Sequence, residues 1–85
     1  MDITKYVAAV AQIIQTELDA QGCPVAKAAQ KSGVPRTTLQ RKLEHPNQYP
    51  FTIAELAQLA SVCDLSPSVI IQRAEALANE ERESR

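Results

Sequence analysis

Apolar residues recur at three- and four-residue spacing along most of the chain, which is the period of an α-helix with one buried face. In the first part of the chain this spacing predicts a helix from about Thr4 to Gln21, ended by Gly22. The buried stripe of that helix is expected to be Ile3, Val7, Val10, Ile14 and Leu18. No run of strict apolar and polar alternation is long enough for a strand, so the pattern predicts an all-α chain.

Two short helices are predicted next, over residues 24 to 32 and 35 to 44. Each begins with a proline, which is favoured in the first turn of a helix because its missing N–H costs nothing there. Gly33 can adopt the positive φ that a tight turn between the helices needs. Ala29 is small enough for them to cross closely. We expect the inward-facing residues here to be Val25, Ala28, Ala29, Val34, Leu39 and Leu43.

A loop and two further helices complete the pattern. Residues 45 to 50 contain two prolines, which exclude a helix. Thr52 and Glu55 fit a capping box, and Ser66 with Pro67 repeats a helix start signal. The expected inner faces are Ile53, Leu56, Leu59, Ala60 and Cys63, then Val69, Ile70, Ala74 and Leu77. We expect one domain over residues 1–78 and a polar, frayed tail over residues 79–85.

The helix, glycine turn and helix over residues 25 to 44 have the spacing of a helix-turn-helix. That motif lays its second helix in the major groove of DNA. With Leu39 and Leu43 turned inward, four positions of the second helix stay exposed. They are Arg36, Thr37, Gln40 and Arg41. All four can donate hydrogen bonds and none is acidic.

The charge distribution supports this interpretation. The 85-residue chain has a net charge of −1, which alone argues against a general nucleic-acid binder. Residues 24 to 43, however, contain five basic and no acidic residues, while the rest holds four basic and ten acidic residues, a net charge of −6. The basic segment coincides with the predicted motif. A solvated helix face is the alternative interpretation of the same charges.

Composition agrees with one small helical domain. The chain is 45% hydrophobic with few aromatic residues, so its core should consist mainly of Ala, Val, Ile and Leu. Cys23 and Cys63 are too few for a disulfide scaffold and lack metal-ligand spacing. We expect Cys63 to be buried and Cys23 to lie in a loop, without a disulfide if the chain is cytosolic. With no signal peptide and no apolar run of membrane-spanning length, we expect a soluble, cytoplasmic protein.

The segment from about Pro24 to Ile71 resembles the Xre/Cro family of helix-turn-helix domains, which includes the DNA-binding domains of phage repressors. The resemblance rests on residues 32–43 (SGVPRTTLQRKL), on residues 51–60 (FTIAELAQLA) and on residues 65–67 (LSP). Within the family, the chain looks like immunity repressors of actinobacterial phages and prophages. The resemblance implies a compact five-helix lambda-repressor-like domain in a bacterial host, associated with the nucleoid. It also implies a repressor that occupies an operator and blocks polymerase.

Two positions depart from the family pattern. A glutamine often opens the second helix of the family and braces a phosphate, whereas Pro24 and Val25 occupy that place here. The position three residues after Leu39 is often apolar in the family and is Lys42 here. Because Leu43 can supply the core contact, we expect Lys42 to be free for a phosphate or for solvent.

Three residues are the candidate base readers. Arg36 lies at the helix end that enters the groove, and its planar fork can pair with guanine O6 and N7, or else contact only phosphate. Thr37 can touch a base edge or a thymine methyl, and Arg41 shares its exposed face. The candidate phosphate or mixed contacts are Lys27, Gln30, Lys31, Thr38, Gln40, Lys42, Asn47 and Gln48. Tyr49 is expected either to pack under the loop or to touch DNA.

No enzyme is indicated, because the single histidine, His45, has no catalytic partner nearby and no glycine-rich phosphate loop is present. We expect no cofactor, metal or small-molecule ligand. The expected partner is a double-stranded DNA operator, bound by a monomer or a homodimer. Ile70, Ile71 and Leu77 offer apolar surface for a dimer, although ordinary core packing is favoured for Ile70.

Two alternatives stay open on the sequence. A chain of this length fits either a complete small repressor or the DNA-binding part of a longer one. The rival function is an all-helical protein-interaction module without DNA binding, which the acidic remainder of the chain would suit.

Overall fold

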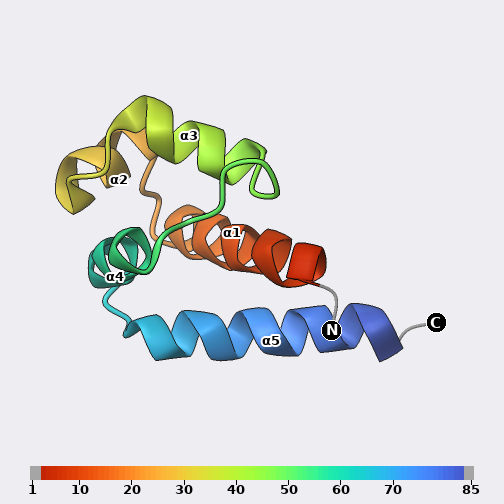
Figure 1. The fold of residues 1–85 in the computed structure, drawn as a ribbon. Helices are drawn as coiled ribbons and strands as arrows, with labels where there is room; N and C mark the ends of the chain where they lie inside the picture. The colour runs from red at the N-terminus through yellow and green to blue at the C-terminus, as the bar shows by residue number, and fades with distance from the viewer. Residues whose placement is uncertain (1–2, 84–85) are drawn as a thin grey trace.

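Glycines and prolines divide the chain into helices at the predicted places. The computed structural model describes the backbone of residues 3–83 and the side chains of residues 3–80, and within them the chain is all-helical, without strands. Gly22 and Gly33 end helices with positive φ values of 62° and 84°. The helices are α1 (Ile3–Ala20), α2 (Val25–Ser32), α3 (Arg36–Glu44), α4 (Ile53–Val62) and α5 (Pro67–Glu83) (Figure 1). The predicted all-α class is confirmed.

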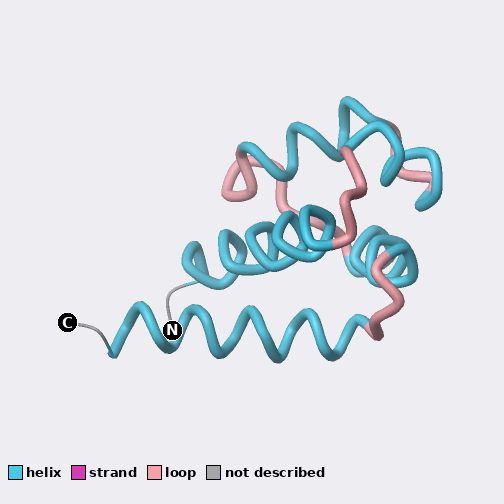
Figure 2. Tube along the Cα trace, turned by 180° about the vertical axis from the view of Figure 1, so that it is seen from behind, coloured by secondary structure: helices cyan, strands magenta, loops and turns pink. Residues whose placement is uncertain are grey.

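Helix α1 lies at the centre of the arrangement. It runs antiparallel to α5 on one side and contacts α3 on the other, as Figure 2 shows from behind. Three small residues of these helices, Ala9 and Ala11 of α1 and Ala74 of α5, are buried. An ion pair between Arg73 and Glu17 also joins α5 to α1. Helix α4 packs against α2 and α5 and closes one end.

The core is aliphatic, as the composition predicts. Its largest fully buried side chains are Ile14, Leu18, Leu39, Leu59 and Ile70. They come from α1, α3, α4 and α5, and the same cluster includes Ala28 and Ala29 of α2, so it joins all five helices. Isolated helices of 8 to 10 residues, such as α2 to α4, are marginal in water. Burial of apolar side chains between the helices therefore supplies much of their stability.

Two predicted core positions are wrong. Ile3 and Ile53 were expected on inner faces, but their side chains are 69% and 79% exposed. Each is the first residue of its helix as the structure describes it. Hydrophobic periodicity identifies which face of a helix is buried, but it does not say how far along the helix the covering elements extend.

The last helix is longer than expected. The backbone is helical to Glu83, although we predicted a frayed tail from Asn79, and residues 84 and 85 lie outside the described part. Glutamate and arginine are good helix formers, so a polar segment indicates exposure to water and not loss of helix. Ile70 is fully buried in the core, while Ile71 and Leu77 are partly buried.

Both cysteines are buried and free of a disulfide. Cys63 lies in the core, as predicted, and burial raises the pKa of its thiol, with smaller contributions from Glu17 and Cys23. Cys23 lies in the loop between α1 and α2. A neutral, buried thiol is a poor nucleophile and behaves as a small hydrophobic side chain.

No single helix within the described residues is long and apolar enough to cross a membrane. Residues Ile53–Val62 and Pro67–Glu80 together meet the length and composition of a span, but the two helices are bent by 101° at the break. The apolar side chains that give this pair its hydrophobicity include residues buried in the core, namely Leu56, Leu59, Ala60, Ile70 and Ala74.

Candidate nucleic-acid interface

A tight turn joins α2 to α3. Gly33 is left-handed, and its N–H donates to the Ala29 carbonyl over 3.0 Å, which closes the end of α2. The Val34 N–H donates to Ser32 Oγ over 3.2 Å. Pro35 is extended and directly precedes α3. We call residues 25–44, with both helices and this turn, the α2–α3 unit.

The α2–α3 unit is attached to the core through a few small or aliphatic side chains. Ala28 and Ala29 of α2 are buried, and Leu39 is the buried residue of α3, with no exposed surface. Val34 is buried in the turn, and Leu43 packs partly buried against the core. These residues are the ones predicted to face inward, and their burial leaves the opposite face of α3 open.

The four polar positions expected on that open face are all exposed. They are Arg36, Thr37, Gln40 and Arg41, and Thr38 is half-buried. Thr37, Gln40 and Arg41 line an open surface depression with Glu44 and His45. Arg36 is not part of this depression and lies at the start of the same helix. No side chain caps the N-terminus of α3, so the positive end of its helix dipole is not neutralised by an acidic cap.

Arg41 is held by an aromatic contact from the following loop. Its guanidinium lies over the Tyr49 ring, 5.2 Å from the ring centroid, in a cation–π arrangement. The loop folds back because the N–H groups of Gln48 and Tyr49 both donate to the His45 carbonyl, over 3.2 and 2.9 Å. Tyr49 is 41% exposed, so it is not buried beneath the loop. Asn47 and Gln48 are exposed in the same loop.

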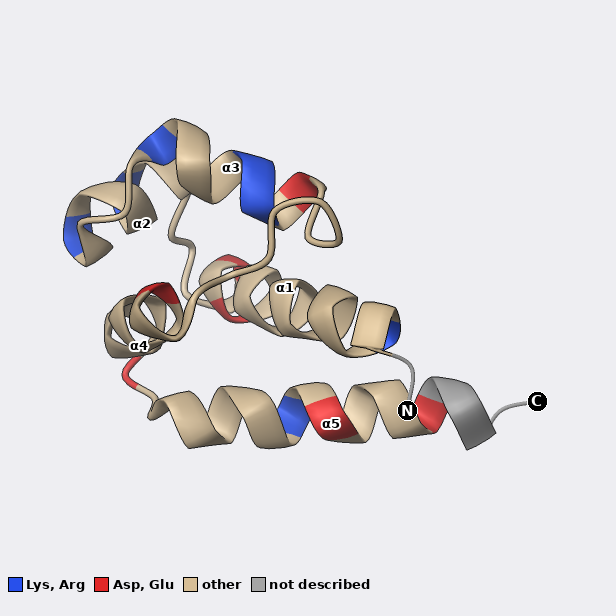
Figure 3. Cartoon of the chain, viewed as in Figure 1, with Lys and Arg blue, Asp and Glu red and all other residues tan. Residues whose placement is uncertain are grey.

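The remaining candidate cations lie on α2. Lys27, Gln30 and Lys31 are exposed there. Figure 3 shows blue on α2 and α3 with one red residue at the end of α3, whereas, among the described residues, α1, α4 and α5 carry other red segments and only two blue ones, on α1 and α5, which are Lys5 and Arg73. The red residue of α3 is Glu44, the single acidic residue of the unit. Most of the described basic residues are therefore gathered on the α2–α3 unit, and most of the described acidic residues lie outside it.

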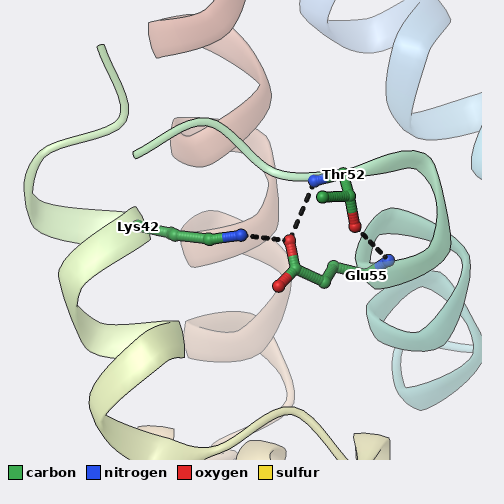
Figure 4. Close-up of polar contacts among 3 residues, drawn as sticks. All are labelled: Lys42, Thr52 and Glu55. Carbon is green, nitrogen blue, oxygen red and sulfur yellow. Dashed lines mark hydrogen bonds and ion pairs between the residues drawn. The ribbon is translucent and has the colours of Figure 1, made fainter. Parts of the chain in front are cut away.

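Lys42 is placed differently from the other basic residues of the unit. It was expected to be free for phosphate or solvent, but its side chain is only 15% exposed and its ammonium binds the Glu55 carboxylate (Figure 4). The same Glu55 oxygen accepts the Thr52 N–H over 2.8 Å, and Thr52 Oγ1 accepts the Glu55 N–H over 3.1 Å. The predicted capping box at the start of α4 is confirmed, with Lys42 as an additional member.

The burial of Glu55 and its contacts with Lys42 and Thr52 shift the pKa of its carboxyl group. Partial burial acts to raise it, but the hydrogen bonds from Lys42 and Thr52 and the charge of Lys42 lower it by more. The pKa of Glu55 is therefore below its ordinary value, and the carboxylate stays ionised at neutral pH.

Two contacts of this surface have no counterpart in the sequence pattern. The capping box can be read from Thr52 and Glu55, but nothing in the pattern pairs Lys42 with a residue 13 positions away. The stacking of Tyr49 on Arg41 depends in the same way on how the loop folds. Among the described residues, no group of three or more His, Cys, Asp or Glu side chains is placed to hold a metal ion.

Comparison of the chain with protein-family models, with curated proteins and with solved structures found no match. The function therefore has to be inferred from the residues and geometry of the α2–α3 unit.

Proposed function

We propose that this chain is a sequence-specific double-stranded DNA-binding transcriptional regulator built on an Xre/Cro-type, lambda-repressor-like helix-turn-helix domain. The most specific form of the proposal is a phage or prophage immunity repressor, or its DNA-binding domain. One observation carries it. Helix α3 buries Leu39 and exposes Arg36, Thr37, Gln40 and Arg41, in a segment that concentrates five basic residues.

Helix α3 would enter the major groove with its exposed face toward the bases. Arg36, at the N-terminal end, has the forked donors that match guanine O6 and N7, and one such pair discriminates between bases by about 1–3 kcal/mol. Thr37 and Arg41 share the depression on the same face and would read neighbouring positions. Arg41 would do so from a guanidinium that already contacts the Tyr49 ring.

Contacts to phosphate would surround this face. Lys27, Gln30 and Lys31 on α2, with Asn47 and Gln48 in the loop, are exposed and on the elements that flank α3. Gln40 and Thr38 are on α3 itself, at its side and near its start. Such contacts add affinity and salt dependence without sequence information.

The net charge of −1 is compatible with this proposal because the charges are segregated. The α2–α3 unit would face the phosphates, while the acidic remainder of the molecule would be repelled by them. Repulsion on one side and attraction on the other favour a single orientation on the duplex. Bound to an operator in this orientation, the domain would block polymerase.

Selection of bound duplexes from a random DNA library, with the purified chain at near-physiological salt, tests the proposal. An enriched motif is expected, and its symmetry would distinguish a homodimer from a monomer. Arg36→Ala should change the preferred base at one position. Lys31→Ala should lower the affinity for duplexes of every sequence about equally, and it should reduce the slope of log affinity against log salt by about 1.

Lys5→Gln is the matched control, because it removes a positive charge from α1, away from the α2–α3 unit. It should leave both the motif and the salt slope close to those of the wild type. The absence of an enriched motif together with salt-independent, negligible DNA binding would contradict the proposal. That result would favour an all-helical protein-interaction module.

A further inference from the structure

Lys42 is the exception among the five basic residues of segment 24–43. Lys27, Lys31, Arg36 and Arg41 are exposed, whereas the Lys42 side chain is 15% exposed and its Glu55 partner is 17% exposed. Figure 4 shows the Lys42 side chain extending from α3 directly to the Glu55 carboxylate at the start of α4. A cation in this position has already exchanged most of its hydration for a protein partner.

The contact joins two elements that the chain connects only through a loop. Lys42 lies in the last turn of α3, Glu55 in the first turn of α4, and residues 45–52 lie between the helices. Leu43 and Phe51 pack against the core on either side of this loop. The Lys42–Glu55 contact therefore closes a ring that includes the end of α3, the loop with Asn47 and Gln48, and the cap of α4.

The Glu55 carboxylate has a defined position because it is bound twice. One of its oxygens accepts from Lys42 and from the Thr52 N–H at 2.8 Å, so the capping box fixes where the carboxylate lies. A lysine bound to a fixed, mostly buried carboxylate is restricted in its own rotamers. Its net charge is also cancelled locally, which makes it a weak ligand for a phosphate.

We propose that Lys42 is a positioning residue for DNA binding, which holds the end of α3 and the loop 45–52 in place through Glu55 and does not itself bind phosphate. This inference rests on the proposed function. It adds a distinction between two roles of basic residues. Exposed lysines such as Lys27 and Lys31 would neutralise phosphates, whereas Lys42 would orient the surface on which the DNA contacts lie.

Two variants separate positioning from phosphate contact. Lys42→Met keeps the length and the apolar stem of the side chain and removes the ammonium. Glu55→Gln keeps an oxygen for the Thr52 N–H and removes the negative charge. If Lys42 positions the surface, each variant should lower affinity for the selected duplex by roughly three- to thirty-fold. The double variant should lose no more affinity than the single variant with the larger loss, because both substitutions break the same contact. The salt slope should stay that of the wild type.

A direct phosphate contact predicts the opposite pattern. Lys42→Met would then reduce the salt slope by about 1, and Glu55→Gln would tighten binding, because it would free the ammonium and remove a negative charge. Lys31→Met is the matched control, since Lys31 is an exposed lysine of α2 and should lose both affinity and slope. Either a reduced slope for Lys42→Met or tighter binding by Glu55→Gln would overturn the inference.

Amide hydrogen exchange on the free protein gives a readout that does not need DNA. Both variants should speed exchange in residues 42–52 and leave α1 and α5 unchanged, which also shows that the variants are folded. Unchanged exchange in residues 42–52 would overturn the positioning role. Failure of the wild type to bind any duplex would instead overturn the proposed function. A wild type that binds while Glu55→Gln binds more tightly would overturn only the role of Lys42.

Discussion

At the scale of single residues, the surface of the α2–α3 unit depends on a few side chains and backbone conformations that have no substitutes nearby. Gly33 provides the left-handed conformation of the turn, and Tyr49 supports the guanidinium of Arg41. Each can be changed without altering the aliphatic core, so each gives a test that is local.

Gly33→Ala should lower the free energy of unfolding by about 1–2 kcal/mol, because an L-residue with a side chain is strained at a φ of 84°. A Cβ at this position would meet nothing within 4 Å, so the cost is conformational and not a clash. Gly33→Asn should cost less, since asparagine tolerates the left-handed region better. Urea denaturation measures both, and equal stabilities for the two variants would contradict this account.

Tyr49→Ala should weaken binding to the selected duplex by a few-fold, because it removes a cation–π contact of about 0.5–1 kcal/mol that restricts the Arg41 side chain. Tyr49→Phe keeps the ring face and should bind like the wild type. Affinity and base preference of both variants can be compared on duplexes changed one base pair at a time. A loss in Tyr49→Phe equal to that in Tyr49→Ala would instead assign the effect to the hydroxyl.

At the scale of elements, helix starts are defined by local chemistry, and α4 is the clearest example. Its capping box satisfies two backbone N–H groups, and Lys42 adds a second hydrogen bond to the Glu55 carboxylate. The start of α3, by contrast, has no side-chain cap. Side chains therefore bond backbone N–H groups at the start of α4, whereas α3, the helix proposed to meet DNA, has no side-chain cap at its N-terminus.

Thr52→Ala should lower the free energy of unfolding by about 1 kcal/mol, because it removes the oxygen that accepts the Glu55 N–H. Thr52→Ser retains that oxygen and should remain within a few tenths of a kcal/mol of the wild type. Thermal unfolding followed by circular dichroism would measure the difference. An alanine variant as stable as the serine variant would show that the cap contributes nothing.

The ion pair with Lys42 also predicts a pH dependence. Because the pKa of Glu55 is lower in the folded state, its ionised form stabilises the fold above the unfolded value of about 4.3. That contribution is lost as the pH falls through the lowered folded pKa. Glu55→Gln should therefore be less stable than the wild type at neutral pH, and the difference in stability should disappear as the pH falls through the lowered folded pKa of Glu55. Urea denaturation across this range tests it, and a difference independent of pH would contradict it.

At the scale of the whole molecule, one largely aliphatic cluster holds the five helices together while leaving one face of α3 open. Helix α1 lies between α5 and α3, and the α2–α3 unit contacts α4 through α2 and α1 through α3. This arrangement explains how a chain with a net charge of −1 presents a basic surface.

Leu39→Ala should lower the free energy of unfolding by about 2–5 kcal/mol, because Leu39 is fully buried and is the buried anchor of α3. Ile53→Ser should change it by no more than about 0.5 kcal/mol, since Ile53 is 79% exposed although the periodicity places it on an inner face. Chemical denaturation of both variants compares the two positions directly. A large loss of unfolding free energy in Ile53→Ser would show that Ile53 is a core residue, as the hydrophobic periodicity predicts.

Much of this architecture is determined by the sequence itself. Gly22 and Gly33 end helices, Thr52 and Glu55 begin one, and the inward positions Ala29, Val34 and Leu39 follow from spacing. These features are predictable because they depend on residues within a few positions of one another, where backbone conformation and hydrogen bonding are local. The separation of charge along the chain is a sequence property for the same reason.

The tertiary structure alone decides which side chains those local elements bring together. It leaves Ile3 and Ile53 uncovered, places Tyr49 under Arg41 and binds Lys42 to Glu55. Each of these outcomes depends on where the end of a helix or the path of a loop lies relative to another element. Spacing along one helix contains no information on that arrangement, because the free energy of such contacts is set by packing between segments far apart in the sequence.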